Sequence, residues 1–131
     1  MIGLGTNTLL RLLVKDDEQQ LRKLMAALES ISDVEPVVVN VVVVQEAVWV
    51  MTKVLGFSKS RVVTLLQDLL DQDDLLVVPK SAVRQAVQGW AAGKAEFADY
   101  LIGELNAQSG CRTTLTFDTK PAQHPTFTRV V

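Results

Sequence analysis

The sequence contains a valine-rich run, VVVNVVVV at residues 37–44, in which one asparagine interrupts seven valines. β-Branched side chains favour strands, and a strand that is apolar at nearly every position is typical of a parallel sheet covered on both faces. The run is far too short to span a bilayer. We therefore predict a buried parallel strand over residues 37–44.

Strand-like and helix-like patterns alternate along the rest of the 131 residues. This alternation predicts an α/β fold, a three-layer α/β/α sandwich with a central, mostly parallel sheet. The chain has no repeats or linker-like tracts, so we expect a single domain over residues 1–131. We expect strands at 1–4, 37–44, 75–78 and 111–117, and helices at 8–15, 16–31, 45–55, 59–72, 81–93 and 96–110.

Charge and cysteine content limit the classes of function. The formal net charge of −2 argues against a general nucleic-acid binder, although it leaves room for a local basic groove beside an acidic pocket. The lone cysteine, Cys111, cannot form an internal disulfide, which favours a reducing compartment. The N-terminus does not resemble a signal peptide. We expect a cytoplasmic protein without a membrane segment.

Carboxylates occur near the predicted ends of several strands. Glu46 follows the valine run, Asp118 follows the last strand, and Glu96 and Asp99 share one helix face. Each has an ordinary alternative explanation, namely a helix N-terminal charge, a turn residue and a solvated acidic face. Ligands in parallel sheets collect at the carboxyl ends of strands, and oxygen donors without His or Cys suit Mg²⁺ or Mn²⁺. Together the acids predict metal-assisted phosphoryl hydrolysis.

Short segments in a fixed order indicate a family. Along the chain, GTNTLLRLLVKDD is followed by VQEAVWVM, then EFADYLIGEL, and finally TFD, ending at Asp118. In this combination the sequence resembles PIN-domain ribonucleases of the VapC toxin family. In those proteins the first strand ends in Asp-Thr-Asn, the second acid follows a valine-rich strand, the third lies in Asp-Phe-x-Asp-x-Leu-Ile, and Thr-Phe-Asp closes the site.

The resemblance implies roles for particular residues. Glu46 and Asp99 would be the principal metal ligands, and Asp118 would complete the acidic cluster. Supporting roles fall to Asn7 and Thr116, which would orient carboxylates or water, with Glu96 at an adjoining acidic position. Arg11 and Lys15 are candidates for contacting RNA phosphates, with a salt-bridged surface as the alternative for both.

Gly5 stands where the family has its first metal-binding aspartate. A phosphate-binding turn built on Gly3 and Gly5 would need a third glycine at position 8, which is Thr8. We therefore interpret Gly5 as a missing carboxylate, which predicts weak metal binding and much reduced cleavage. Replacement of an original aspartate and natural decay of the site both remain open.

The resemblance implies a Mg²⁺- or Mn²⁺-dependent endoribonuclease toxin, inactive or crippled at Gly5. It also implies a VapB-like antitoxin, a structured RNA substrate such as transfer or ribosomal RNA, and a homodimer. The alternative is a catalytically silent PIN-fold binding module. A phosphoacceptor receiver domain fits less well, because Asp16 and Asp17 come a full helix after the first strand.

Overall fold

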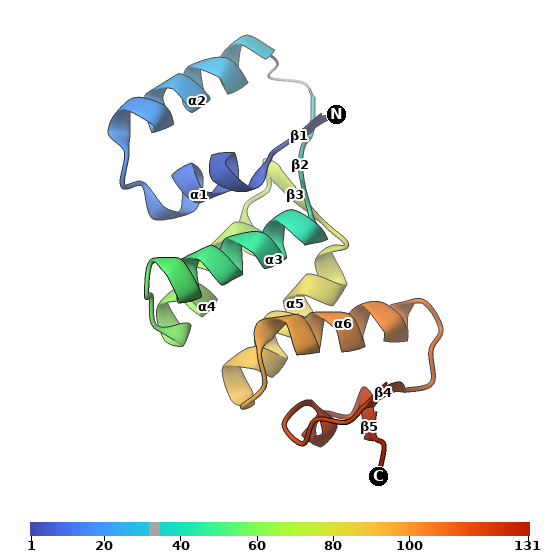
Figure 1. Cartoon of the computed structure of the whole chain (residues 1–131). Coiled ribbons are helices and arrows are strands. Elements are labelled where there is room, and N and C mark those ends of the chain that lie inside the picture. The colour runs from blue at the N-terminus through green and yellow to red at the C-terminus, as the bar shows by residue number, and fades with distance from the viewer. Residues whose placement is uncertain (32–34) are drawn as a thin grey trace. The chain divides into compact units, whose positions relative to one another are not determined.

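The computed structural model describes residues 1–31 and 35–131. The chain separates into two compact units, Met1–Val78 (unit 1) and Pro79–Val131 (unit 2), each of which has a parallel sheet of its own (Figure 1).

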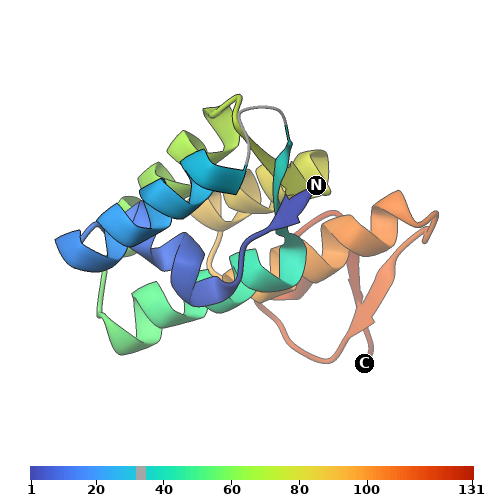
Figure 2. The same ribbon diagram turned by 90° about the horizontal axis from the view of Figure 1, so that it is seen from above.

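Unit 1 is built on a parallel sheet in which β2 (Val37–Asn40) lies between β1 (Ile2–Gly3) and β3 (Leu75–Val78). Ile2 and Leu75 both lie opposite Val37 of the middle strand. Helices α1 (Thr6–Val14) and α3 (Val41–Trp49) contact each other, while α4 (Lys59–Asp71) contacts β3 (Figures 1 and 2). In chain order the unit contains β1 (Ile2–Gly3), α1 (Thr6–Val14), α2 (Glu18–Ile31), β2 (Val37–Asn40), α3 (Val41–Trp49), the π-helix η1 (Val50–Val54), α4 (Lys59–Asp71) and β3 (Leu75–Val78).

The core of unit 1 consists of aliphatic side chains from its sheet and its helices. Full burial of one such side chain contributes about 1.5–3 kcal/mol to folding. The side chains that retain at most 1% of their exposure include Leu9, Val39, Val44, Met51, Val62, Leu66, Leu69, Leu70 and Val77.

The predicted strand over residues 37–44 is wrong in its second half, because α3 begins at Val41. The Asn40 side chain ends the strand and caps the helix, since its Oδ1 accepts a hydrogen bond from the Val43 N–H at 3.0 Å. Val43 and Val44 are buried in the helix. Packing of the apolar face therefore outweighs the modest preference of valine for strands.

Other helix ends show where the sequence was informative. Gly56 has φ +71 just past η1, as expected of a left-handed C-terminal residue. The Ser58 hydroxyl accepts from the Arg61 N–H at 3.3 Å and caps α4, as its position predicts. At the start of α1, Gly5 occupies the N-cap position and supplies no side chain, so the helix begins at Thr6 rather than at the predicted residue 8.

Unit 2 combines two packed helices with a small sheet of its own. The strand expected over 111–117 is shorter and does not join the β1-β2-β3 sheet; it pairs in parallel with the C-terminal strand, so that Thr114 lies opposite Phe127. The Thr113 and Thr128 hydroxyls reinforce this pair at 2.7 Å. The unit contains α5 (Lys80–Ala92), α6 (Phe97–Gln108), β4 (Thr114–Thr116), the 3₁₀ helix η2 (Pro121–Gln123) and β5 (Phe127–Arg129).

Aromatic rings hold α5 and α6 together. Trp90 and Phe97 meet edge to face with ring centroids 5.5 Å apart, and both are buried. Cys111 lies outside this core and is exposed.

The pairings of the described strands are all parallel, and helices surround them. The prediction of an α/β fold with parallel sheet strands is therefore confirmed, and it is consistent with an α/β sandwich. Among the helices of residues 1–31 and 35–131, none has the length and apolarity needed to cross a bilayer.

Candidate active site

Gly5 is separated from β1 by Leu4 alone and lies at the carboxyl end of the strand. The Leu4 N–H donates to the Val38 carbonyl at 2.9 Å and ends the parallel pairing with β2. The Gly5 carbonyl then accepts from the Leu9 N–H at 3.0 Å and starts α1. The chain thus changes from strand to helix at Gly5, an edge where ligands of α/β proteins commonly bind.

The backbone at Gly5 accepts any L-residue. Its φ of −81 and ψ of 173 are in the extended region. A Cβ built on Gly5 meets nothing within 4 Å, so a side chain at this position has open space. Glycine at position 5 is therefore not required by the fold, in contrast to Gly56 with its positive φ.

Glu46 is connected to the segment beside Gly5. The Thr6 hydroxyl donates to Glu46 Oε2 at 3.3 Å, which joins the first residue of α1 to the middle of α3. Glu46 is exposed, whereas its neighbours Ala47 and Val48 are buried. Packing of α3 on its apolar side thus leaves the carboxylate at the surface near the start of α1.

The other predicted residues of unit 1 have local roles. Arg11 forms an ion pair with Asp16, which favours the salt-bridged alternative for Arg11. The Lys15 backbone is in the left-handed region at φ 57 and closes α1, its N–H donating to the Arg11 carbonyl. Asn7 is exposed on α1. Phosphate contacts by Arg11 and Lys15 stay predictions.

In unit 2, Glu96 and Asp99 form a capping box at the start of α6. The Glu96 N–H donates to Asp99 Oδ2 at 3.1 Å, while the Glu96 side chain accepts from the Asp99 N–H. One carboxylate oxygen of Asp99 is thus engaged by the backbone, and an ionised carboxylate retains further acceptor sites. The three-residue spacing of Glu96 and Asp99 therefore has a structural explanation, the capping of α6, besides the metal-binding role that the family resemblance implies.

Asp118 follows β4, and Thr116 organises its backbone. The Thr116 hydroxyl accepts a hydrogen bond from the Asp118 N–H at 3.1 Å. Thr116 therefore fixes the turn that carries Asp118, while the Asp118 side chain is exposed.

Glu96, Asp99 and Asp118 line one cavity of about 290 Å³, here called the acidic cavity. Lys94 and Lys120 line it too, and our sequence analysis did not single them out. A usable signal was present, because each lysine lies two positions from a candidate acid, Glu96 or Asp118. The cavity therefore combines oxygen donors for a cation with ammonium groups that attract an anion.

The predicted site residues thus form two groups, Gly5 with Glu46 in unit 1 and Glu96 with Asp99 and Asp118 in unit 2. Within residues 1–31 and 35–131, no three His, Cys, Asp or Glu side chains are gathered closely enough to hold a metal ion. The assignment of these residues as metal ligands stays a prediction.

The parallel strands, and the carboxylates that follow them in the sequence, assign the chain to the class of α/β proteins with acidic ligand sites. The PIN domain model matches residues 4–125, and the chain belongs to the PIN domain family. PIN domains are generally nucleases, usually dependent on divalent metal ions, and they often act in toxin–antitoxin systems. The family generally binds nucleic acid and often pairs with antitoxins. No curated protein and no solved structure matched the chain significantly.

Proposed function

We propose that this chain is the toxin of a VapBC-type pair, a Mg²⁺-dependent endoribonuclease whose activity is crippled at Gly5. The observation that carries the proposal is the arrangement at the end of β1. Gly5 has an extended backbone and open space, and the adjacent Thr6 hydroxyl contacts the Glu46 carboxylate at 3.3 Å. In our proposal, an acidic side chain at position 5 and Glu46 belong to the same metal site.

The donor set fits a hard divalent cation, because the candidate ligands are carboxylates without His or Cys. As the resemblance implies, we propose Glu46, Asp99 and Asp118 as the ligands of the ion, and residues 1–131 as a single PIN-like domain. A bound Mg²⁺ or Mn²⁺ supplies neutralisation of phosphodiester charge and activation of water. Thr116 positions the turn of Asp118, and Thr6 holds the Glu46 carboxylate.

The rest of the assignment follows the sequence resemblance. We propose structured RNA, such as transfer or ribosomal RNA, as the substrate, and a VapB-like antitoxin as the partner. A homodimer and a cytoplasmic location belong to the same proposal. Gly5 removes two potential oxygen ligands and one negative charge from this centre, which explains why the chain as it stands is expected to be inactive.

The test compares Gly5→Asp with Gly5→Asn in the full chain. Both side chains fit the open space and can cap α1, but only aspartate adds a negative charge. We expect Gly5→Asp to bind Mn²⁺ in calorimetry, to gain thermal stability on addition of Mg²⁺, and to cleave transfer or ribosomal RNA. The asparagine variant controls for shape and capping and should do none of these.

A catalytically silent binding module is the second candidate, and the capping role of Asp99 favours it. Such a module needs no metal, because its carboxylates serve the fold. It predicts that Gly5→Asp neither binds Mn²⁺ nor cleaves RNA. This result would overturn the nuclease proposal, whereas metal binding and cleavage by Gly5→Asp would exclude the silent module.

A further inference from the structure

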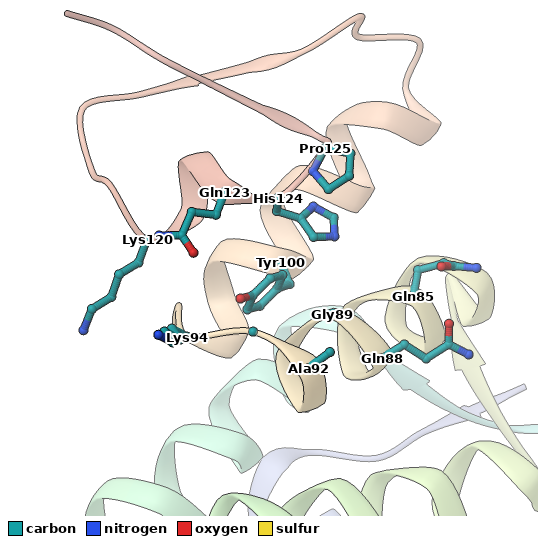
Figure 3. A pocket seen from close by; sticks show the side chains of 11 residues that line it. Gln85, Gln88, Gly89, Ala92, Lys94, Tyr100, Lys120, Gln123, His124 and Pro125 are labelled. Carbon is teal, nitrogen blue, oxygen red and sulfur yellow. The ribbon is translucent and has the colours of Figure 1, made fainter.

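A second cavity of unit 2, about 430 Å³ in volume, lies beside α5 and the segment 120–125 (Figure 3). We call it the glutamine cavity, because Gln85, Gln88 and Gln123 line it. Its volume is in the range of small-ligand sites. The acidic cavity contains the capping box and the predicted metal ligands of unit 2. The glutamine cavity has no role in the proposed function.

Glycines on one side of the glutamine cavity allow an aromatic ring to pack closely against α5. A Cβ at Gly89 would lie 2.8 Å from Tyr100 Cδ1, and one at Gly93 would lie 2.8 Å from Tyr100 Cζ. The Tyr100 hydroxyl is fixed in turn, since it accepts from the Ala95 N–H at 3.1 Å. The wall of the cavity is therefore rigid and preformed.

A second ring continues this wall. His124 meets Tyr100 edge to face with centroids 5.2 Å apart. Its Nδ1 lies 2.8 Å from the Thr126 hydroxyl and its Nε2 lies 3.9 Å from Glu104 Oε1. The imidazole is thus held at Nδ1, with the Glu104 carboxylate near Nε2, and the partly exposed His124 ring lines the cavity.

Polar groups are arranged at opposite ends of this surface (Figure 3). Gln85 and Gln88 lie at one end, and Lys94 and Lys120 lie at the other. A glutamine amide offers both donors and an acceptor, which suits the edge of a nucleobase. Lysine ammonium groups suit a phosphate.

The two lysines connect the glutamine cavity to the acidic cavity, because Lys94 and Lys120 line both. In the part of the chain that the structure describes, Lys94 and Lys120 are not among the residues that form ion pairs. Both remain available for an anion shared between the cavities.

From these observations we propose that the glutamine cavity binds one nucleotide of the RNA substrate, adjoining the phosphate that is cleaved. The base contacts the partly exposed ring of His124 and the amides of Gln85 and Gln88, while the buried Tyr100 ring supports His124 from behind. The phosphate of the nucleotide is bound by Lys94 and Lys120. The inference rests on the proposed nuclease function and assigns to unit 2 a preference for the base beside the cut.

Nuclear magnetic resonance tests binding in the chain as it stands, without metal. The sequence contains one histidine and one tyrosine, and both rings line the cavity, so the ring signals of His124 and Tyr100 report it without ambiguity. We expect saturable shifts of both signals with 5′-mononucleotides, and at least tenfold weaker binding of inorganic phosphate. Equal binding of phosphate and nucleotide would overturn a base contact.

Variants test the two ends of the cavity. Lys120→Ala should weaken nucleotide binding about tenfold, as expected for loss of a charged hydrogen bond. Gln88→Ala should change the ranking of the four bases. Lys80→Ala, on the same helix as Gln88 but outside the cavity, is the matched control and should leave binding unchanged. If Lys80→Ala and Lys120→Ala weakened binding equally, non-specific attraction of the nucleotide to positive charge would explain the result, and the proposal would be overturned.

Two further outcomes separate this inference from the proposed function. A short RNA should bind tighter than a mononucleotide; the reverse order would indicate a site for a free nucleotide and overturn the RNA subsite. If Gly5→Asp cleaves RNA but Gln88→Ala leaves its base preference unchanged, the subsite is wrong while the nuclease stands. If nucleotides bind but Gly5→Asp is inactive and binds no Mn²⁺, the nuclease proposal fails, and the subsite beside a cleaved phosphate fails with it.

Discussion

The Thr6 hydroxyl donates a hydrogen bond to Glu46 Oε2 at 3.3 Å, across forty positions of sequence. Thr6 begins α1 and Glu46 lies within α3, two helices that contact each other in unit 1. The bond limits the positions that the exposed carboxylate adopts, and it does so beside Gly5. Within the proposed nuclease, Thr6 is therefore a positioning residue for Glu46.

Replacing Thr6 tests this role in the Gly5→Asp background. Thr6→Val keeps the shape of the side chain and removes the hydroxyl, so we expect RNA cleavage to fall about tenfold, roughly the 1.4 kcal/mol of one charged hydrogen bond. The free energy of unfolding should change by less than about 1 kcal/mol, because the bond is exposed.

Thr6→Ser serves as the conservative control, since serine retains the hydroxyl. In the Gly5→Asp background, cleavage by Thr6→Ser should stay within about twofold of cleavage by the Gly5→Asp protein, because the hydrogen bond to Glu46 is retained. Equal losses in the serine and valine variants would show that the bond to Glu46 is not what Thr6 contributes.

The cap at Asn40 predicts a difference in stability between two asparagines of unit 1. Asn40→Ala removes the acceptor of the Val43 N–H and should lower the free energy of unfolding by about 1 kcal/mol. Asn7→Ala changes an exposed position on α1 and should stay within about 0.5 kcal/mol. Urea denaturation measures both, and similar losses in the two variants would contradict the assignment of Asn40 as the cap.

Much of the fold could be predicted from local sequence patterns, and the errors of the prediction have physical causes. The strand at Leu75–Val78 and the cap at Ser58 follow from short-range signals that the structure retains. Val41 and Val44 were misassigned because valine prefers strands, whereas burial of α3 and the cap at Asn40 decide their conformation. Strand partners were harder to predict, since pairing of β4 with β5 depends on contacts that periodicity does not encode.

Asp99 serves α6 and, in our proposal, the metal ion, and one substitution separates these roles. Asp99→Asn retains an oxygen that accepts from the Glu96 N–H but removes the charge. We expect a change in unfolding free energy of less than about 1 kcal/mol, and loss of Mn²⁺ binding in the Gly5→Asp background. Calorimetry and urea denaturation give the two readouts. Retained Mn²⁺ affinity would remove Asp99 from the ligand set.

The candidate site was predictable in its chemistry but not in its local contacts. The order of the acidic motifs is a property of the sequence, and the PIN domain family that the motifs resemble matches residues 4–125. The capping box was also readable, because Glu96 and Asp99 have its three-residue spacing. The bond between Thr6 and Glu46 was not, since it depends on how α1 packs against α3. Lys94 and Lys120 were missed, although each lies two positions from a candidate acid, Glu96 or Asp118.

Close packing of Tyr100 against Gly93 predicts coupling between these two positions. A Cβ at Gly93 would clash with the Tyr100 hydroxyl and lie 2.8 Å from Cζ, so Gly93→Ala should destabilise the protein by about 1–3 kcal/mol. Tyr100→Phe leaves the Ala95 N–H without its partner and should cost about 1–3 kcal/mol. In the double variant the hydroxyl is absent and part of the clash is relieved, so the combined loss should be smaller than the sum by more than about 0.5 kcal/mol. Urea denaturation of the four proteins measures this cycle. Losses that add within about 0.3 kcal/mol would contradict direct contact, and with it the rigid wall that the glutamine cavity requires.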